Sequence, residues 1–402
     1  MNKFVLLSAK IGLAIASTAL TLGLIEVSLR LTMDDPRSFT PAVLADPDYG
    51  WRWAGHEYVR GRDLHGELKT DWWTNSLGFY DVDHDPARPK GVRRILFIGD
   101  SFTVAGAVLM KETFVKRVEE ALSSRGGRWE CLNMGVSGYG TGQELKLYEK
   151  IGRLFDPDIV IVSFCIDNDI ADNHPQLSEP RPYFILKNGA LVFQPIDVSI
   201  IQKSVEKHSK IKQSFFKSCL HKSYLWTLKR AVAVQIRAKM RESAAITRVM
   251  RTLRFWKQKQ VSREWGHFIT RLPPEEQKVW DEAHEVTIKT LQLFNKMVRK
   301  DGHEFLVVLV PSQLQVYDDS LRMFQSFYVN FGADAVDLNK TNIFLKANLA
   351  GDSIPILDPL PTFRAHSAPD RLYYKRDFHL TSAGHKELAQ AIIDCLQLEA
   401  SK

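Results

Sequence analysis

After about residue 92, short apolar runs alternate regularly along the chain with longer segments of helical periodicity. The apolar runs predict buried strands at 95–98, 129–132, 159–164, 304–310 and 354–357. The helical segments lie near 113–125, 142–154, 276–300, 335–348 and 382–396. Strands that alternate with helices form a parallel sheet with helices on both faces. The pattern therefore predicts an α/β fold with three layers, α/β/α, around a central parallel five-stranded sheet.

The N-terminus has a different pattern. Residues 4–25 are 22 mostly apolar residues, interrupted only by Lys10. As a helix they would be about 33 Å long, enough to cross the hydrocarbon core of a bilayer. A cleavable signal peptide is the alternative, with a small-x-small site at 14–16, but its apolar stretch after Lys10 would be too short. The pattern favours an uncleaved transmembrane anchor over residues 1–32.

Charged residues around this segment predict its orientation. Lys3 and Lys10 lie at the start of the apolar core, whereas Glu26, Asp34 and Asp35 follow it along with Arg30. Positive charge is retained on the cytoplasmic side of a membrane. We therefore expect a single-pass protein whose main domain is periplasmic or otherwise extracytoplasmic.

Composition divides the rest of the chain. Residues 33–91 are rich in Asp, Trp, Tyr, Gly and Pro and predict a connector packed on the core, with a turn at 75–81 that enters it. Residues 92–398 form the main domain, and residues 175–275 are an insertion within it. The insertion starts with a hairpin signal, two apolar runs (183–186 and 190–193) around Lys187-Asn188-Gly189, and continues as a mostly helical stretch.

Positive charge is concentrated in the insertion. The net charge of the 402-residue chain is +7, but residues 203–263 hold 17 Lys or Arg and only 2 Asp or Glu. Outside the cytoplasm nucleic acid is not an expected partner, so anionic lipid headgroups or an acidic polysaccharide suit the segment better. An amphipathic helix on the bilayer surface and a solvated helical cap over the active site are both open interpretations of the stretch 200–263.

The candidate chemistry starts at the first strand. Ser101 follows that strand through Gly99-Asp100, at the edge where α/β sheets place their active sites. A serine becomes a nucleophile only beside a base and oxyanion donors. Asp377 and His379, two residues apart before the last helix, could supply an oriented base. His385 is expected to be an incidental, solvated histidine.

Two further strand ends carry polar or glycine-rich loops. The loop 133–142 is rich in glycine and suits exposed backbone N–H groups; it lacks the Lys-Ser/Thr ending of a nucleotide-binding P-loop. The loop 165–173 holds Asp and Asn residues but not the glycine and distant glutamate of a calcium-binding EF-hand. Asn168 in this loop could direct its amide at a developing oxyanion. Four scattered cysteines have no metal-ligand spacing, and Cys131 and Cys165 lie in apolar runs that predict buried thiols.

Together these segments resemble the SGNH hydrolase superfamily, also called GDSL esterases and lipases. Gly99-Asp100-Ser101 matches the first block of that family. Asn133 and Gly138 have the spacing of the second block. Asn168-Asp169 matches the third block, and Asp377 with His379 matches the last.

Two departures from the family pattern concern the last two blocks. The last block is usually Asp-x-x-His, and the Asp-x-His found here is similar to the membrane-associated and polysaccharide-acetylating branches, such as the alginate acetyltransferases. Ile166 stands where the third block usually has glycine.

The resemblance implies acyl transfer through a serine ester, with Ser101 as nucleophile, His379 as base and Asp377 orienting it. The backbone N–H groups of Ser101 and Gly138 and the amide of Asn168 would form the oxyanion hole. No metal or organic cofactor is implied. Water as acceptor gives an esterase acting on a small-molecule or glycan ester, and a sugar hydroxyl gives an O-acyltransferase that modifies a cell-surface polysaccharide. A non-catalytic glycan-binding or assembly factor on the same fold is the remaining alternative.

Overall fold

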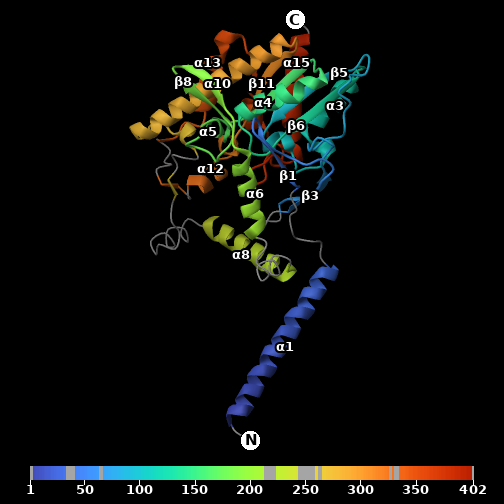
Figure 1. The fold of residues 1–402 in the computed structure, drawn as a ribbon, viewed down its shortest axis with the longest axis vertical. Coiled ribbons are helices and arrows are strands. Elements are labelled where there is room, and N and C mark those ends of the chain that lie inside the picture. Colours follow the sequence, from blue (N-terminus) through green and yellow to red (C-terminus); the bar gives the residue numbers. More distant parts are fainter. Residues whose placement is uncertain are drawn as a thin grey trace.

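The computed structural model describes residues 3–32, 41–62, 67–211, 223–242, 259–260, 265–325, 328–329 and 335–400. Its centre is a five-stranded sheet (Figure 1). The strands are β5 (Arg93–Gly99), β6 (Trp129–Gly135), β7 (Ile159–Cys165), β11 (Glu304–Val310) and β13 (Ile356–Leu357). They lie in the order β13-β11-β7-β5-β6, and every pairing is parallel. The predicted parallel sheet is confirmed, with β6 longer and β13 shorter than expected.

Helices cover both faces of the sheet. Successive residues of β5 alternate between two buried clusters: Leu96 and Ile98 belong to one, Ile95 and Phe97 to the other. The first cluster also takes side chains from α4 (Thr141–Lys150), α10 (Pro274–Lys300) and α13 (Lys340–Leu349). The second takes side chains from α3 (Phe114–Ser123) and α15 (Ser382–Ala400). The chain therefore has the expected α/β/α layers, because strands that are apolar on both sides must be covered on both.

Two predicted helices have different bounds. The helix expected at 142–154 ends at Lys150, where Ile151 leaves helical geometry (φ −124°), and a 3-10 turn η2 (Gly152–Phe155) follows. The helix expected at 335–348 begins only at Lys340. Val336 instead pairs with Ile269, and the Asp337 carboxylate accepts the Asn339 N–H in a turn. Local side chain to backbone bonds of this kind compete with helix.

The N-terminal segment forms one continuous helix, α1 (Lys3–Thr32), which projects from the folded domain in Figure 1. Residues Leu6–Thr32 are long and apolar enough to span a membrane, and no other helix in the described part of the chain meets that test. Their length and composition are those of a membrane anchor or of a signal sequence.

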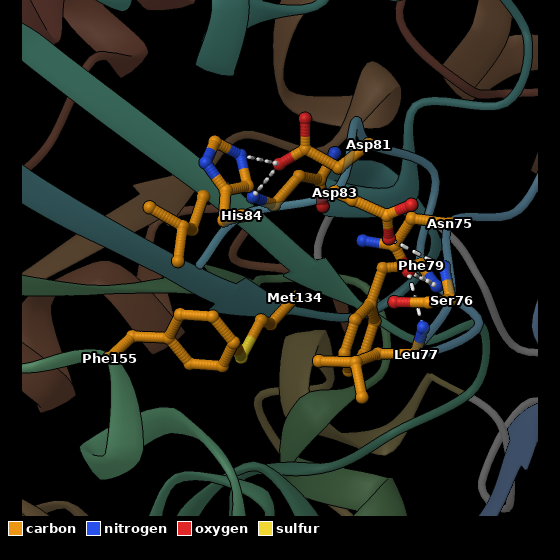
Figure 2. Close-up of a pocket in the computed structure, with 11 residues that line it drawn as sticks. Asn75, Ser76, Leu77, Phe79, Asp81, Asp83, His84, Met134 and Phe155 are labelled. Atoms are coloured by element: carbon orange, nitrogen blue, oxygen red, sulfur yellow. Dashed lines mark hydrogen bonds and ion pairs between the residues drawn. The ribbon is translucent and has the colours of Figure 1, made fainter. Parts of the chain in front are cut away.

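The connector contains two antiparallel hairpins that its aperiodic composition does not predict. The first joins β1 (Val43–Asp46) to β2 (Gly50–Trp53), and the second joins β3 (Tyr58–Arg62) to β4 (Lys69–Trp73). The predicted turn at 75–81 is confirmed. Asn75 Oδ1 accepts the N–H groups of Leu77 and Phe79, and Phe79 is buried. Figure 2 shows this turn beside Met134 and Phe155, where it lines a small pocket.

The insertion starts with the predicted hairpin, β8 (Tyr183–Lys187) and β9 (Ala190–Gln194), and continues into α6 (Val198–Ile211) and α8 (Tyr224–Glu242). The short strand β10 (Lys259–Gln260) pairs with β12 (Tyr328–Val329). The other residues of the basic stretch lie outside the described residues. The residues of η3 (Gly266–Phe268) are already buried in the hydrophobic core, although the insertion was expected to end at 275. The remaining short helices outside the candidate site are η1 (Met110–Glu112), α11 (Gln313–Val316), α12 (Asp318–Gln325), η5 (Ala350–Asp352) and α14 (Leu360–Ala365).

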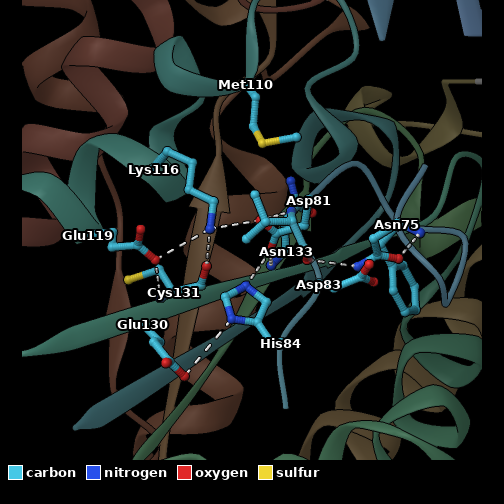
Figure 3. Close-up of polar contacts among 12 residues, drawn as sticks. Asn75, Asp81, Asp83, His84, Met110, Lys116, Glu119, Glu130, Cys131 and Asn133 are labelled. Atoms are coloured by element: carbon cyan, nitrogen blue, oxygen red, sulfur yellow. Dashed lines mark hydrogen bonds and ion pairs between the residues drawn. The ribbon is translucent and has the colours of Figure 1, made fainter. Parts of the chain in front are cut away.

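One buried carboxylate attaches the connector to the edge of the sheet. Asp81 accepts the backbone N–H of Asn133 in the edge strand β6 at 2.8 Å. It also lies 2.7 Å from Lys116 Nζ and 3.2 Å from His84 Nε2 (Figure 3). Burial alone would raise the pKa of Asp81, but the hydrogen bond from His84 and the charge of Lys116 lower it below the ordinary value. The carboxylate therefore stays ionised and fully paired inside the protein.

Replacing Lys116 with methionine is expected to lower the free energy of unfolding by about 3 kcal/mol, because it leaves the buried Asp81 charge without its main counter-ion. Chemical denaturation of the detergent-solubilised full-length protein measures this. Lys111→Met, at an exposed position nearby, is the control and should change stability by less than about 0.5 kcal/mol. Because the folded-state pKa of Asp81 is lowered, its stabilisation is present at neutral pH and is lost as the pH falls through that pKa. Equal stability of the two variants would contradict this assignment.

Candidate active site

Strand β5 delivers Ser101 to the edge of the sheet. The strand ends at Gly99, and the one-turn helix α2 (Ser101–Val104) begins at Ser101, with Asp100 accepting the Phe102 N–H at 2.9 Å. A Cβ atom on Gly99 would lie 2.2 Å from Thr103 Oγ1, so only glycine permits this tight turn. The strand order reverses beside β5, between β6 and β7, and open α/β sheets bind ligands at such a point.

The structure brings Ser101, His379 and Asp377 together from opposite ends of the main domain. His379 Nε2 lies 2.9 Å from Ser101 Oγ, and His379 Nδ1 lies 2.6 Å from Asp377 Oδ1. The ring of Phe102 packs against the His379 ring at 5.0 Å between centroids. A hydroxyl, an imidazole and a carboxylate connected in this order can act as a nucleophile, a base and an orienting group.

A left-handed residue accommodates the short Asp-x-His spacing. Phe378, between Asp377 and His379, has φ +72°, a conformation that is uncommon for a residue with a side chain. The loop is closed by hydrogen bonds from Tyr374 N to His379 O and from Phe378 N to Tyr374 O, and the Phe378 ring packs against the core. This turn accompanies a direct Asp377–His379 bond, so the shorter spacing does not prevent the contact.

The connector supports this loop from outside. Glu67 Oε2 accepts the backbone N–H groups of Arg376 at 2.9 Å and Asp377 at 3.3 Å. A segment more than 300 residues away in the sequence therefore fixes the backbone of the loop that carries Asp377.

Gly138, the predicted backbone donor, lies in a loop held by two distant side chains. Gly138 has φ +77°, which favours glycine at this position. Its carbonyl accepts a hydrogen bond from Arg181 Nη1 at 2.6 Å, and the neighbouring Ser137 carbonyl accepts one from Trp51 Nε1 at 3.2 Å. The orientation of the Gly138 peptide is thus set by residues of the insertion and of the connector.

Asn168, the predicted amide donor, is connected to the same arginine. It precedes the one-turn helix α5 (Asp169–Asp172), and its Nδ2 donates to Asp172 Oδ2 at 2.7 Å. Asp172 Oδ1 in turn lies 3.0 Å from Arg181 Nη2. Asn168 also interacts with the Asp100 side chain. Its role as an oxyanion donor, like those of Gly138 and the Ser101 N–H, concerns a bound substrate and stays a prediction.

One family model matches the C-terminal part of the chain. Residues 273–401 match the family model described as "SGNH hydrolase-like domain, acetyltransferase AlgX". The match takes in the loop with Asp377 and His379 and most of the helices around β11 and β13. This C-terminal part of the chain is similar to an SGNH hydrolase-like domain.

Solved structures with similarity to the chain include hydrolases of several kinds. A lipase/acylhydrolase from Enterococcus faecalis is 12% identical, covers 76% of this chain and 96% of its own, and has a TM-score of 0.38. The acetyl xylan esterase AlAXEase is 12% identical with 75% and 98% coverage and a TM-score of 0.38. A GDSL-like lipase from Bacteroides thetaiotaomicron is 9% identical with 76% and 89% coverage and a TM-score of 0.35. At these identities and TM-scores the likenesses carry no argument about function. No curated protein matches the sequence.

Several buried carboxyl groups lie near Ser101 and His379. Burial raises the pKa of Asp100 to about 6 and that of Asp167 to about 7, and it raises those of Glu144 and Asp169 well above the ordinary value. Both carboxyl oxygens of Glu144 are buried without a hydrogen-bond partner. Glu144 and Asp169 are therefore largely protonated at neutral pH, whereas Asp167 titrates near neutrality and Asp100 is mostly ionised there. Within the described residues, His, Cys, Asp and Glu side chains form no group of three or more suited to a metal ion.

One histidine of the domain differs from the sequence prediction. His385, expected to be solvated, is buried in α15, where its ring stacks on Phe114 and its Nδ1 accepts the Phe114 N–H at 3.3 Å. Burial lowers its pKa to about 3, so it is a neutral structural residue. Its spacing from the buried Leu388 and Ile392 on one helical face is the signal that indicated burial. Cys131 and Cys165 are buried free thiols, as predicted.

Proposed function

We propose that this protein is a serine-dependent acyl-transfer enzyme that forms an acyl-enzyme on Ser101. The observation that carries the proposal is the continuous chain of contacts from Ser101 Oγ through His379 to Asp377, at 2.9 and 2.6 Å. A non-catalytic binding protein has no need for a hydroxyl, an imidazole and a carboxylate in this order.

In the proposed reaction His379 Nε2 takes the proton from Ser101 Oγ as the oxygen attacks the acyl carbon. The Ser101–acyl bond forms, the ester C–O bond breaks, and the leaving alcohol takes the proton back from His379. Asp377 stabilises the intermediate imidazolium. The N–H groups of Ser101 and Gly138 and the Asn168 amide would hold the oxyanion, and loss of one donor is expected to raise the barrier by about 3 kcal/mol.

The acyl acceptor decides between two activities. Water gives ester hydrolysis, for example of O-acetyl groups on carbohydrate. The match of residues 273–401 to an acetyltransferase domain supports the second candidate, transfer of the acyl group to a hydroxyl of a cell-surface polysaccharide. We further propose that α1 is an uncleaved anchor and that the catalytic domain is extracytoplasmic, on the basis of Lys3 and Lys10 before the apolar core and Glu26 after it.

The proposal is tested with the purified full-length protein and p-nitrophenyl acetate. We expect release of p-nitrophenol, and covalent labelling of Ser101 by a fluorophosphonate, which requires an activated hydroxyl. Adding a soluble oligosaccharide acceptor separates the two activities: an esterase leaves free acetate, whereas a transferase leaves acetylated sugar. A protein that neither turns over the ester nor reacts with the probe is not a serine acyl-transfer enzyme.

The pH profile should have an acid limb set by His379. Burial lowers the pKa of this imidazole, but the hydrogen bond and charge of Asp377, with the charges of Asp100 and Asp167, raise it above the ordinary value. His379 accepts a proton only when it is neutral, so kcat/KM should rise with pH. The midpoint of this rise should lie above about pH 6.5. Asp100 and Asp167 titrate in the same range, which broadens the limb. Histidine ordinarily titrates between about pH 5 and 8. Activity that stays constant over this range would contradict the role of His379 as base.

A further inference from the structure

Helix α8 of the insertion is attached to the N-terminal helix α1. Glu26 of α1 accepts three hydrogen bonds from the start of α8: from Ser223 Oγ at 2.8 Å, Tyr224 N at 3.0 Å and Leu225 N at 3.0 Å. The Arg30 guanidinium lies over the Tyr224 ring at 5.2 Å. The first backbone N–H groups of a helix have no partner within the helix, so Glu26 acts as their cap. Among the described elements, α8 packs mainly against α1 (Figure 1).

This attachment fixes the depth of α8 relative to a membrane. Residues 11–25 of α1 hold no charged side chain, and Glu26 follows them directly. A carboxylate is costly within the hydrocarbon core, so Glu26 marks the boundary at that end of α1 when α1 spans the bilayer. The first turn of α8 must then lie at the level of the lipid headgroups. In Figure 1 α8 runs across the direction of α1, beyond its end and below the folded domain.

The surface of α8 has the chemistry of that layer. From Tyr224 to Met240 the helix has no acidic residue and four exposed basic residues: Lys229, Arg230, Arg237 and Lys239. Its apolar side chains are also exposed: Val232 is 46% and Ile236 is 54% accessible, one helical turn apart. A helix that presents both kinds of side chain suits the boundary between anionic headgroups and acyl chains.

We propose that α8 lies in the headgroup layer of an anionic phospholipid bilayer and holds the domain at the membrane surface beside its anchor. The partner is the lipid surface itself, recognised through the basic residues and the Val232–Ile236 strip. The sequence leaves two interpretations open, a helix on the bilayer surface and a helical cap over the active site. The contact of α8 with Glu26 of α1 favours the surface helix. The inference is independent of catalysis and rests on α1 spanning the membrane.

The test places a small environment-sensitive fluorescent amino acid at position 236 of the full-length protein in lipid vesicles. Position 343 is the matched control, because Ile343 is equally an isoleucine on a helix and is 61% exposed, but on α13 at the far side of the domain (Figure 1). The vesicles contain phosphatidylcholine alone or mixed with phosphatidylglycerol, and carry lipids with a spin label below the headgroup. We expect several-fold stronger quenching at 236 than at 343, and stronger quenching at 236 in the anionic vesicles. Equal quenching at the two positions overturns the proposal. Quenching at 236 that is the same with and without phosphatidylglycerol also overturns it.

Charge reversal tests the basic residues separately. The variant K229E/R230E/R237E/K239E should lose the added quenching at 236 in anionic vesicles, although α1 still holds the protein in the membrane. Its control, K278E/K296E/R299E/K300E, makes the same change of charge at four exposed positions of α10 and should leave the quenching unchanged. Circular dichroism of both variants verifies the fold without reference to enzyme activity. Identical quenching in the two variants would count against the proposal.

Discussion

Replacing Ser101 with alanine is expected to reduce turnover of p-nitrophenyl acetate at least about a thousandfold, because the acyl-enzyme then has no oxygen on which to form. The serine hydroxyl contacts His379 at the surface of the site, so its removal leaves no cavity in the core. The thermal midpoint should therefore stay close to that of the native protein. Steady-state kinetics and thermal unfolding of the same preparation measure both effects.

The matched control is Ser124→Ala, at an exposed serine that follows α3. It should keep full activity and should still react with the fluorophosphonate, whereas Ser101→Ala should do neither. Substantial ester turnover by Ser101→Ala would remove the assignment of Ser101 as nucleophile and with it the proposed mechanism.

The sheet was predictable because its strands are apolar on both faces. Strand β7 is buried along its whole length, and β11 has the predicted bounds. Such runs need no long-range information, since only a covered parallel strand buries every side chain. The two hairpins of the connector were missed for the opposite reason. Their residues alternate little in polarity, and their strands are fixed by contacts with distant segments, such as the bond from Thr70 to Gly106.

The candidate site divides in a similar way. Ser101, Asp377 and His379 could be found because each stands in a short motif at a strand end or before a helix, and the structure brings the three together. Arg181 and Glu67 could not be found, because each acts on the backbone of a loop far away in sequence. No local periodicity predicts which carbonyl an arginine will reach. The positive φ of Phe378 is equally a property of the closed loop and not of its sequence.

The Asp377–His379 contact leads to the second large effect. Asp377→Asn should lower kcat by about three to four orders of magnitude, the size seen when the carboxylate of a serine triad becomes an amide. The amide can donate to Nδ1 and so favour the tautomer that carries its proton on Nε2, which cannot accept the Ser101 proton. It also removes the charge that stabilises the imidazolium. Asp370→Asn, at an exposed position nearby, should change kcat little.

The residual activity of Asp377→Asn should also have a different pH dependence. Asp377 is the main group that raises the pKa of His379 against the effect of burial. Without its charge the pKa of His379 falls, so the acid limb of the profile should move to lower pH while the plateau rate drops. A structural defect would lower the rate at every pH without moving the limb. An unchanged midpoint in Asp377→Asn would show that Asp377 does not act on His379 through its charge, whatever the loss in rate.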